Sequence, residues 1–372
     1  MTNGIVRIGV IGAGFARTTQ IPGFKNCKNA QIVAIASARR EHAEEVARNF
    51  GIPHVERDWR ALVARDDVDL VSIVTPVVTH CEMTLAAVSN GKSVLCEKPM
   101  AMNADEARHM TEAARARGVL ALIDHELRFL PGRQKMREML QRGELGKTKH
   151  AGVTFRSDSR ADRSRLWNWW SDERQGGGAL GAICSHIVDG FRWLLATEVE
   201  SVTCSLATHI AERKDHQGQA RRVTTDDEVN LLLRFAENDL VAGATANVSV
   251  SMVAAGKPLH RMEIFGERGA LRVEGDGELW QSKIGDDEWK KVDIDRGELA
   301  RGMNDNGWAR GFTVFSQEIV DALVAGRTTV DGAATFEDGY RTQLVLDAAR
   351  RSNDNGCREK SEPPAVAGGP TV

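Results

Sequence analysis

The chain has 372 residues, of which 42% are hydrophobic and 27% are charged, with 49 basic against 52 acidic side chains. This composition is typical of a globular protein that is long enough for two domains. The net charge of −3 gives no general nucleic-acid footprint, and no apolar run approaches the roughly 18 residues of a membrane span.

The six cysteines are scattered, with no C-x-x-C pair and no Cys/His cluster at zinc spacing. The apolar run at residues 6–11 already belongs to the fold pattern, so we expect no signal peptide before it. We therefore expect a reduced, cytoplasmic protein that binds no metal, no membrane and no nucleic acid.

The first buried strand is predicted at residues 5–11, and a glycine-rich turn follows it at once. Two glycines let the backbone turn tightly and approach a pyrophosphate, whose charge then lies at a helix N-terminus. The third position of this fingerprint holds Arg17 instead of glycine or alanine, but a turn directly after the first strand is the context that the motif requires. We predict a dinucleotide site that includes Gly12, Gly14, Phe15 and Ala16.

The second strand, predicted at residues 31–36, ends where a dinucleotide site usually places the Asp or Glu that binds the ribose 2′-hydroxyl of NAD. This chain has Ser37-Ala38-Arg39-Arg40 there. A hydroxyl and two guanidinium groups suit a 2′-phosphate, because arginine pairs well with phosphate oxygens. We therefore predict NADP, with Ser37, Arg39 and Arg40 as contacts. The alternative is that the arginines only begin a helix and that Glu41 serves NAD.

Further strands at residues 70–74, 93–95 and 119–124 alternate with helical spacing between them. This alternation predicts an α/β fold with a parallel, doubly wound Rossmann sheet over residues 1–124. Lys98 stands at the mouth of the strand at 93–95, where such sheets bind ligands. Pro99 has a fixed φ and stiffens the turn, which gives the lysine a defined direction. A surface Lys-Pro turn is the alternative.

The second half has a different rhythm, with alternating runs at residues 147–156, 199–207, 229–235, 240–252, 260–265 and 270–273. These runs predict a large, open, mainly antiparallel sheet, which with its helices forms an α/β domain at residues 125–352. An exposed face of this sheet could mediate dimerisation. The last stretch, residues 353–372, is rich in Pro, Gly and charge and predicts a disordered tail.

Two segments of the second half carry candidate site residues. Trp167, Trp169 and Trp170 either cover a ligand or pack at an interface, and the large burial of aromatic rings favours packing. A triple glycine at 176–178 leads into a helix at 179–195, where His186 and Asp189 are neighbours and Ala182 lies one turn earlier. Histidine suits proton transfer near neutral pH, although a hydrogen-bonded core histidine is the alternative.

From about residue 5 to 352, the chain resembles the Gfo/Idh/MocA family, named for glucose–fructose oxidoreductase, inositol dehydrogenase and a rhizopine-catabolism protein. The resemblance rests on ordered motifs: Gly12-Ala13-Gly14, Thr75-Pro76 with His80, Glu97-Lys98-Pro99, Gly176-Gly177-Gly178 to Ser185-His186, and Asp189. It implies an N-terminal Rossmann domain, a C-terminal domain with an open sheet, and oxidation or reduction of a CH–OH carbon of a sugar, polyol or related compound by a bound nicotinamide cofactor.

Position by position, the resemblance makes Lys98 the active-site lysine and His186 the catalytic histidine. It places Thr75, Pro76, His80 and Glu97 beside the cofactor, and Glu97 and Lys98 beside the nicotinamide. Many family members carry an aspartate four residues before the histidine, where this chain has Ala182. The usual partner that would orient the imidazole is therefore absent, and Asp189 is a possible substitute on the other side.

Two other functions stay open. Ala182 would suit a non-catalytic regulator of the same fold that binds NADP and a protein partner. A tightly bound and recycled cofactor would instead give net elimination, epimerisation or hydrolysis. We expect a homodimer or homotetramer and an unnamed sugar-like or polyol-like substrate, and the candidate pocket residues are His125, Arg128, Arg156, Trp167, Trp170 and Asp189.

Overall fold

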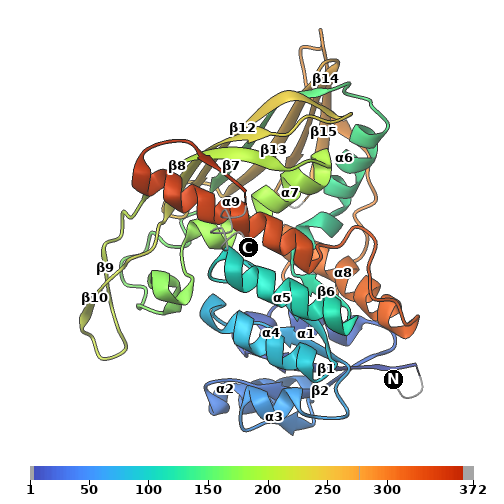
Figure 1. The fold of residues 1–372 in the computed structure, drawn as a ribbon, viewed down its shortest axis with the longest axis vertical. Coiled ribbons are helices and arrows are strands. Elements are labelled where there is room, and N and C mark those ends of the chain that lie inside the picture. Colours follow the sequence, from blue (N-terminus) through green and yellow to red (C-terminus); the bar gives the residue numbers. More distant parts are fainter. Residues whose placement is uncertain (1–3, 276, 363–372) are drawn as a thin grey trace, which may run out of the picture.

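The computed structural model describes residues 4–275 and 277–362. Two sheets lie at opposite ends of the molecule, and helices fill the space between them (Figure 1). The N-terminal sheet has six parallel strands in the order β3-β2-β1-β4-β5-β6. Its strands are β1 (Val6–Ile11), β2 (Ala30–Ala36), β3 (His54–Val55), β4 (Leu70–Ile73), β5 (Ser93–Cys96) and β6 (Ala121–Ile123). The predicted doubly wound Rossmann sheet is confirmed.

The order of the strands reverses between β1 and β4, and this switch point is where open α/β sheets bind ligands. The strands are buried on both faces because helices cover each side. Two helices begin at side-chain caps, since Asp58 accepts from Ala61 N and Asn103 accepts from Glu106 N. The helices of this part are α1 (Gln20–Asn26), α2 (Arg40–Phe50), α3 (Trp59–Val63), α4 (His80–Ser89) and α5 (Ala104–Arg117).

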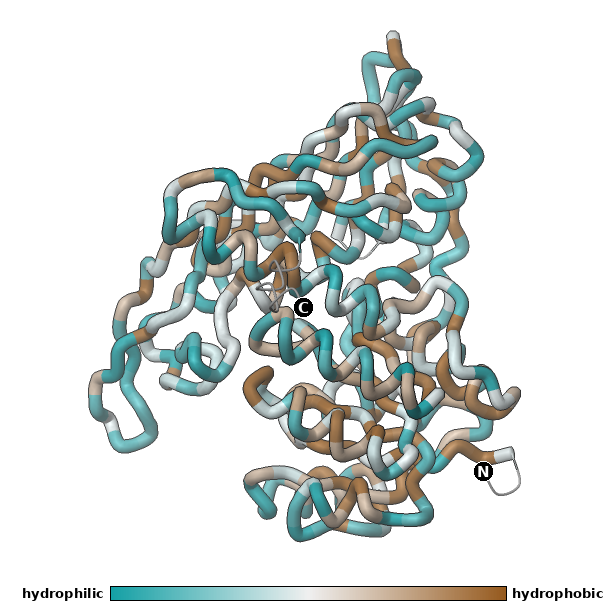
Figure 2. Tube along the Cα trace, viewed as in Figure 1, coloured by the Kyte–Doolittle hydropathy of each residue, from teal (hydrophilic) through white to brown (hydrophobic). Residues whose placement is uncertain are grey.

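The second sheet has nine strands in the order β16-β15-β14-β13-β7-β12-β11-β8-β17. Only β7 and β12 run parallel, so the predicted mainly antiparallel sheet is confirmed. The hydropathy of its strands alternates along the chain (Figure 2), and so does their burial, because one face is covered and the other is open. Its strands are β7 (Thr148–Arg156), β8 (Val199–Ala207), β11 (Glu228–Phe235), β12 (Val241–Ser251), β13 (Leu259–Gly266), β14 (Gly269–Glu274), β15 (Glu278–Lys283), β16 (Lys290–Val292) and β17 (Glu359–Lys360).

Helices α6 (Pro131–Gln141), α7 (Ser185–Leu195) and α9 (Phe336–Asn355) cover the inner face of this sheet. A π-helical turn at Leu180–Cys184 leads directly into α7. A separate two-stranded hairpin, β9 (Glu212–Lys214) with β10 (Ala220–Arg222), projects at the edge of the molecule (Figure 1).

Helix α8 (Gly307–Val324) comes late in the chain but packs into the N-terminal core. Phe312 meets Phe24 edge-on at 5.4 Å between ring centroids, and Phe315 stacks on Phe129 at 4.6 Å. In Figure 1 the orange helix lies beside the blue and cyan part of the chain. A division into residues 1–124 and 125–352 therefore does not separate the two hydrophobic cores.

The expected disordered tail was wrong for residues 353–362. Helix α9 continues to Asn355, since Ser352 Oγ accepts from Cys204 N and Asn353 Oδ1 accepts from Leu206 N. Strand β17 then pairs with β8, so hydrogen bonds to the sheet order this polar segment. Residues 363–372 of the predicted tail lie outside the described residues. Within the described ranges, no helix is long and apolar enough to cross a bilayer.

Candidate active site

Lys98 lies at the carboxyl end of β5, in the turn that the sequence singles out. Glu97 N donates to Ile73 O at 3.0 Å, which carries the strand pairing up to the lysine. The Lys98 Nζ donates to the backbone oxygen of Ala182 at 3.1 Å. The alanine at this position thus contacts the lysine through its carbonyl group, and the turn of residues 180–184 brings the two domains together at the lysine.

His186 follows one helical turn after Ala182 and is 2% exposed. Its Nδ1 lies 3.2 Å from Nδ1 of His125. Its Nε2 is buried and has no hydrogen-bond partner among the described residues. Burial lowers the pKa of His186 well below the usual range for histidine, and the positive charge of Lys98 adds to this effect. The ring is therefore neutral at pH 7 and has one nitrogen free for a ligand.

The neighbours of His125 decide which nitrogen of each ring carries the proton. His125 Nε2 lies 4.0 Å from Oδ1 of Asp189, so the negative carboxylate favours the proton on Nε2. His125 Nδ1 then accepts, and His186 Nδ1 must donate across the 3.2 Å contact. The unpartnered Nε2 of His186 consequently carries a lone pair. Burial lowers the pKa of His125 to about 4, so this ring is also neutral at pH 7.

Arg128 and Asp189, two of the predicted pocket residues, pair with each other. The carboxylate of Asp189 accepts from Arg128 Nε at 2.8 Å and from Nη2 at 2.6 Å. The guanidinium also lies 3.3 Å from Asp338 of α9, and both members of the pair are at most 4% exposed. This buried network joins η3 (Glu126–Phe129), α7 and α9 and holds Asp189 behind His125.

A cluster of buried polar side chains lies next to Lys98. Gln20 Nε2 donates to Glu97 at 2.9 Å and to Asp124 at 2.7 Å, and its oxygen accepts from Ser72 Oγ. Burial raises the pKa of Glu97 and raises the pKa of Asp124 well above its usual range. Glu126 joins the cluster, and burial raises its pKa to about 8. Gln20 thereby ties the helix after the glycine turn to the ends of β5 and β6.

A cavity of about 400 Å³ opens at the carboxyl ends of β1, β2 and β4. Ser37, Thr75 and Pro76 line it, as the sequence predicts for a cofactor site, together with Arg57 and Trp59. The glycine turn borders the same end of β1. At Gly12, with φ +110°, an added Cβ would lie 2.0 Å from Val74 O. Only glycine therefore fits where the end of β1 approaches the residue after β4, as a tight dinucleotide-binding turn requires.

Other predicted cofactor residues lie outside this cavity. Arg40 pairs with Glu44 at 2.8 Å along the surface of α2, and Arg39 is exposed at the start of that helix.

His80 is completely buried, with Nδ1 3.1 Å from Pro99 O and Nε2 3.0 Å from Thr75 O. This histidine joins the turn after β4 to the turn that carries Lys98. Phe15 is 47% exposed beside Gly14, where an added Cβ would meet nothing within 4 Å.

The predicted pocket residues of the second domain are spread over a wider area. Trp167 Nε1 donates to Arg222 O at 3.0 Å, and the guanidinium of Arg160 lies 4.1 Å from the ring centroid of the buried Trp170. Arg156 donates from Nη1 to Ser249 O at 2.8 Å. The structure thus brings Lys98, His125, His186 and Asp189 together. Arg156 does not contact them but lines a cavity with His260 and Trp308, and Trp167 lies apart from both.

Three residues at the site were missed by the sequence-based prediction. The ring of Trp308, at the start of α8, lies 4.8 Å from that of His186, and the ring of His260 lies 6.0 Å from Trp308. Arg57 lines the cofactor cavity beside Ser37. Trp308 and His260 occur in no recognisable motif. Arg57 lies two residues after the end of β3, and its place near a strand end was the available signal.

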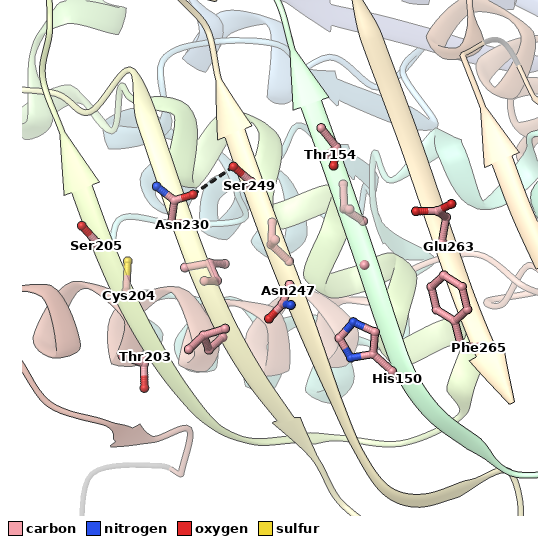
Figure 3. Close-up of a pocket in the computed structure, with 15 residues that line it drawn as sticks. His150, Thr154, Thr203, Cys204, Ser205, Asn230, Asn247, Ser249, Glu263 and Phe265 are labelled. Carbon is pink, nitrogen blue, oxygen red and sulfur yellow. Dashed lines mark hydrogen bonds between the residues drawn. The ribbon is translucent and has the colours of Figure 1, made fainter.

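Another cavity, of about 730 Å³, lies on the outer face of the second sheet. Figure 3 shows its side chains on the strands, with the helices behind the sheet, and a hydrogen bond of 2.9 Å from Ser249 Oγ to Asn230 Oδ1. Leu232, 58% exposed, also lines it. It is remote from Lys98 in the fold because the inner layer of helices separates the two. Among the described residues, no group of three or more His, Cys, Asp or Glu side chains could hold a metal ion.

Comparison with known proteins agrees with this geometry. Residues 6–125 match the family model described as the oxidoreductase family with an NAD-binding Rossmann fold, and residues 133–272 match the Gfo/Idh/MocA C-terminal domain. The chain belongs to the Gfo/Idh/MocA family. It is thus a member of an NAD-binding oxidoreductase family, as the resemblance of its motifs predicts.

Individual proteins resemble most of the chain. An uncharacterized oxidoreductase of Synechocystis is 35% identical over 271 residues, which cover 72% of this chain and 71% of that protein. Levoglucosan dehydrogenase of Pseudarthrobacter phenanthrenivorans is 28% identical, with 84% of this chain and 85% of that protein covered. A solved levoglucosan dehydrogenase complex with NADH and L-sorbose has a TM-score of 0.84 at 25% identity, covering 96% of this chain and 99% of that one.

Proposed function

We propose that the protein is a dehydrogenase or reductase that transfers a hydride between a nicotinamide cofactor and a secondary alcohol or ketone of a sugar, polyol or related compound. One observation carries the proposal. The unpartnered Nε2 of His186 lies one helical turn after the carbonyl that Lys98 Nζ contacts. A base and an ammonium group therefore converge where the Rossmann sheet ends, and this pair suits the oxidation of an alcohol.

Each side chain has a defined part in the proposed reaction. The lone pair of His186 Nε2 takes the hydroxyl proton, while the Nδ1–H bond to His125 holds the ring in this tautomer. Lys98 donates a hydrogen bond to the substrate oxygen and stabilises the developing alkoxide. A bound nicotinamide cofactor would supply the acceptor for the hydride. In the reverse direction, protonated His186 returns the proton to the carbonyl oxygen.

For the cofactor, we propose NADP over NAD. Strand β2 ends at Ala36 with no carboxylate for a 2′-hydroxyl within residues 37–40. The cofactor cavity has a guanidinium from Arg57, whose Nε lies 3.5 Å from Asp58 Oδ2 in the same lining. Arg39 and Arg40 stand next to this edge, at the start of α2. A hydroxyl with nearby guanidinium groups suits a phosphate. The solved levoglucosan dehydrogenase complexes contain NADH, so titration of this protein with both cofactors is a direct test.

We also propose that the protein is a homodimer or homotetramer in which a second copy covers the outer face of the nine-stranded sheet. This face has a cavity of about 730 Å³, and the apolar side chain of Leu232 in its lining is exposed. Exposed patches that contain apolar side chains often mark sites of protein–protein contact. Light scattering should give at least a dimer, and Leu232→Asp should shift the mass toward the monomer. A monomeric wild-type protein would contradict the assembly and would leave the proposed reaction unaffected.

The reaction is tested with protein stripped of cofactor and then titrated with NADPH and NADH, using nicotinamide fluorescence. Oxidation of levoglucosan, L-sorbose and a panel of sugars and polyols follows, measured as formation of reduced nicotinamide. Turnover that is lost in Lys98→Met supports the proposed reaction. Cofactor binding without turnover on any substrate would favour the non-catalytic regulator, and a cofactor that stays bound through purification would favour a recycled one.

A further inference from the structure

A second cavity adjoins the candidate active site on the far side of Trp308. Its volume is about 860 Å³, which is large enough to hold the part of a sugar that extends beyond its reacting carbon. Phe155 and His260 line its inner end from β7 and β13, and Trp308 lines it from the start of α8. The ring centroids of Trp308 and His186 lie 4.8 Å apart, so one aromatic side chain lies against both this cavity and His186. We name it the Trp308 cavity.

A buried arginine stands behind the wall of this cavity. Arg133, in the first turn of α6, is 2% exposed and forms no ion pair with any carboxylate of the described residues. Its Nη2 lies 3.2 Å from Nε2 of His260. Because a guanidinium has only donors, His260 Nε2 must accept, and the ring proton is left on Nδ1. The arginine therefore fixes the tautomer of a histidine that lines the cavity.

The neutral form of His260 is maintained by its surroundings. Burial lowers its pKa to about 3, and the charge of Arg133 acts in the same direction. The facing groups on adjacent elements are Phe155 of β7, which meets the ring edge-on at 5.4 Å, and Trp308 of α8, stacked at 6.0 Å. Neither can take the Nδ1 proton as a carboxylate would. At pH 7 the ring thus offers one donor, polarised by the guanidinium bound to its other nitrogen.

Among the described residues, the acidic groups that line the cavity are paired, whereas two of its basic groups are not. Its acidic lining residues are already paired: Glu274 with Arg261 at 2.7 Å, Glu278 with Lys291, and Asp305 with Arg310. Lys257 and Arg156, which both line the cavity, have no ion pair among the described residues. Near Arg133, the acids whose charges reach it are Glu126 and Asp189. Glu126 is largely protonated at pH 7, with a pKa of about 8, and Asp189 is bound by Arg128.

We propose that the Trp308 cavity binds the part of the substrate beyond the reacting carbon, and that the Nδ1–H of His260 donates to an anionic oxygen there, such as a carboxylate. Arg133 is the positioning residue that fixes this donor. This proposal rests on the proposed function and names its substrate class: an acidic sugar or a related hydroxy acid. A buried cation without a counter-ion is costly unless a bound anion offsets it, and that balance favours an acidic ligand over its neutral analogue.

The test uses the full chain saturated with the cofactor that binds it better, titrated calorimetrically with matched neutral and acidic sugars. The pairs are D-glucose with D-glucuronate and D-galactose with D-galacturonate. In at least one pair the acid should bind about tenfold more tightly or better, as expected for a hydrogen bond to a charged group. Equal affinities in both pairs, or no binding of either acid, would overturn the proposal.

Two variants locate the effect at His260. His260→Phe keeps the ring packing against Trp308 but removes the donor, so the preference for the acid should disappear. His260→Asn places an amide nitrogen close to the position of Nδ1 and should keep most of the preference. A preference that persists unchanged in His260→Phe would show that the anion binds elsewhere and would overturn the assignment.

The part played by Arg133 has its own readout. Long-range ¹H–¹⁵N NMR of the wild-type protein should show His260 as the Nδ1–H tautomer, and Arg133→Met should convert it to a mixture. Observation of the Nε2–H tautomer in the wild-type protein would contradict the proposal even if Arg133→Met does not fold. Cofactor binding distinguishes failure of the proposed function from failure of this inference. If the protein binds neither NADPH nor NADH, the proposed function is refuted. If it binds a cofactor but shows no preference for the acid, only this inference is refuted.

Discussion

The Nδ1 atoms of His125 and His186 lie 3.2 Å apart, and Asp189 stands 4.0 Å behind His125. In this chain a histidine occupies the place of the carboxylate that usually orients a catalytic imidazole. The partner comes from the segment that follows β6 and not from the helix of His186 itself. Although Ala182 replaces the expected aspartate, His186 therefore still has an orienting group.

The contact between these two histidines predicts the effect of removing one of them. His125→Ala should lower turnover about 10- to 100-fold, as for other groups that orient a functional imidazole. His125→Asn keeps an acceptor near the position of Nδ1 and should retain most of the activity. Steady-state kinetics with a substrate found in the sugar panel would measure both. Equal losses in the two variants would argue that His125 contributes shape and not its hydrogen bond.

Lys98 should be indispensable for turnover but not for folding. Lys98→Met should reduce turnover by about 10²–10⁴-fold, the usual contribution of a group that assists proton transfer. Lys98→Arg keeps a charged donor in the turn and tests whether charge alone suffices. Binding of NADPH or NADH to Lys98→Met, followed by fluorescence, controls for damage to the site. Unchanged turnover would remove Lys98 from the mechanism.

The buried carboxyl of Glu126 predicts how stability depends on pH. Its pKa is raised to about 8 in the folded protein, so the folded state holds a proton that the unfolded state has released above its ordinary pKa of about 4.5. This contribution to stability is present at low pH and is lost as the pH rises from about 4.5 to about 8. Glu126→Gln should lose less stability than the wild type between pH 6 and pH 8.5, measured by urea unfolding. Identical losses would place the proton on Asp124 or Glu97 instead.

Two glycines of the first turn offer a matched pair. Gly12→Ala would put a Cβ 2.0 Å from Val74 O at φ +110°, whereas Gly14→Ala meets nothing within 4 Å. We expect Gly12→Ala to destabilise the protein by several kcal/mol, about the upper range for point mutations. Gly14→Ala should leave the melting temperature nearly unchanged and weaken cofactor binding, because it fills space beside the turn. Thermal unfolding and NADPH titration of both variants would separate the two effects.

The cofactor preference makes a distinct prediction for Arg57. Arg57→Met should raise the dissociation constant of NADPH about tenfold, as expected for loss of a charged contact to a phosphate, and leave that of NADH unchanged. Arg40→Met is the control, since Arg40 pairs with Glu44 on the surface of α2. Stronger binding of NADH than of NADPH by the wild type would contradict the NADP assignment.

Local patterns predicted much of this fold. Two of the recognised motifs join a buried apolar strand to a turn whose residues strongly restrict the local structure. They are β1 followed by Gly12-Ala13-Gly14 and β5 followed by Lys98. Alternation of strands and helices is also a local signal, so the Rossmann sheet and the antiparallel sheet were both predictable. The helix of His186 was found in the same way.

Long-range contacts were not predictable from these patterns. The pairing of Arg128 with Asp189, and of Arg133 with His260, joins residues that are 61 and 127 positions apart. A single sequence states which side chains are charged, but only the fold decides which charges neutralise one another. Trp308 belongs to this class as well, since its place at the site depends on how α8 crosses from one domain to the other.

Helix α8 also determines when the first domain can be completed during synthesis. Phe312 and Phe315 fill a gap between α1 and the segment at Phe129, so the first 125 residues cannot close their core by themselves. On the ribosome, this apolar surface must wait for about 180 further residues, and a chain that stops before residue 307 would leave it exposed to aggregation. The nucleotide-binding half is therefore finished almost last, although it is translated first.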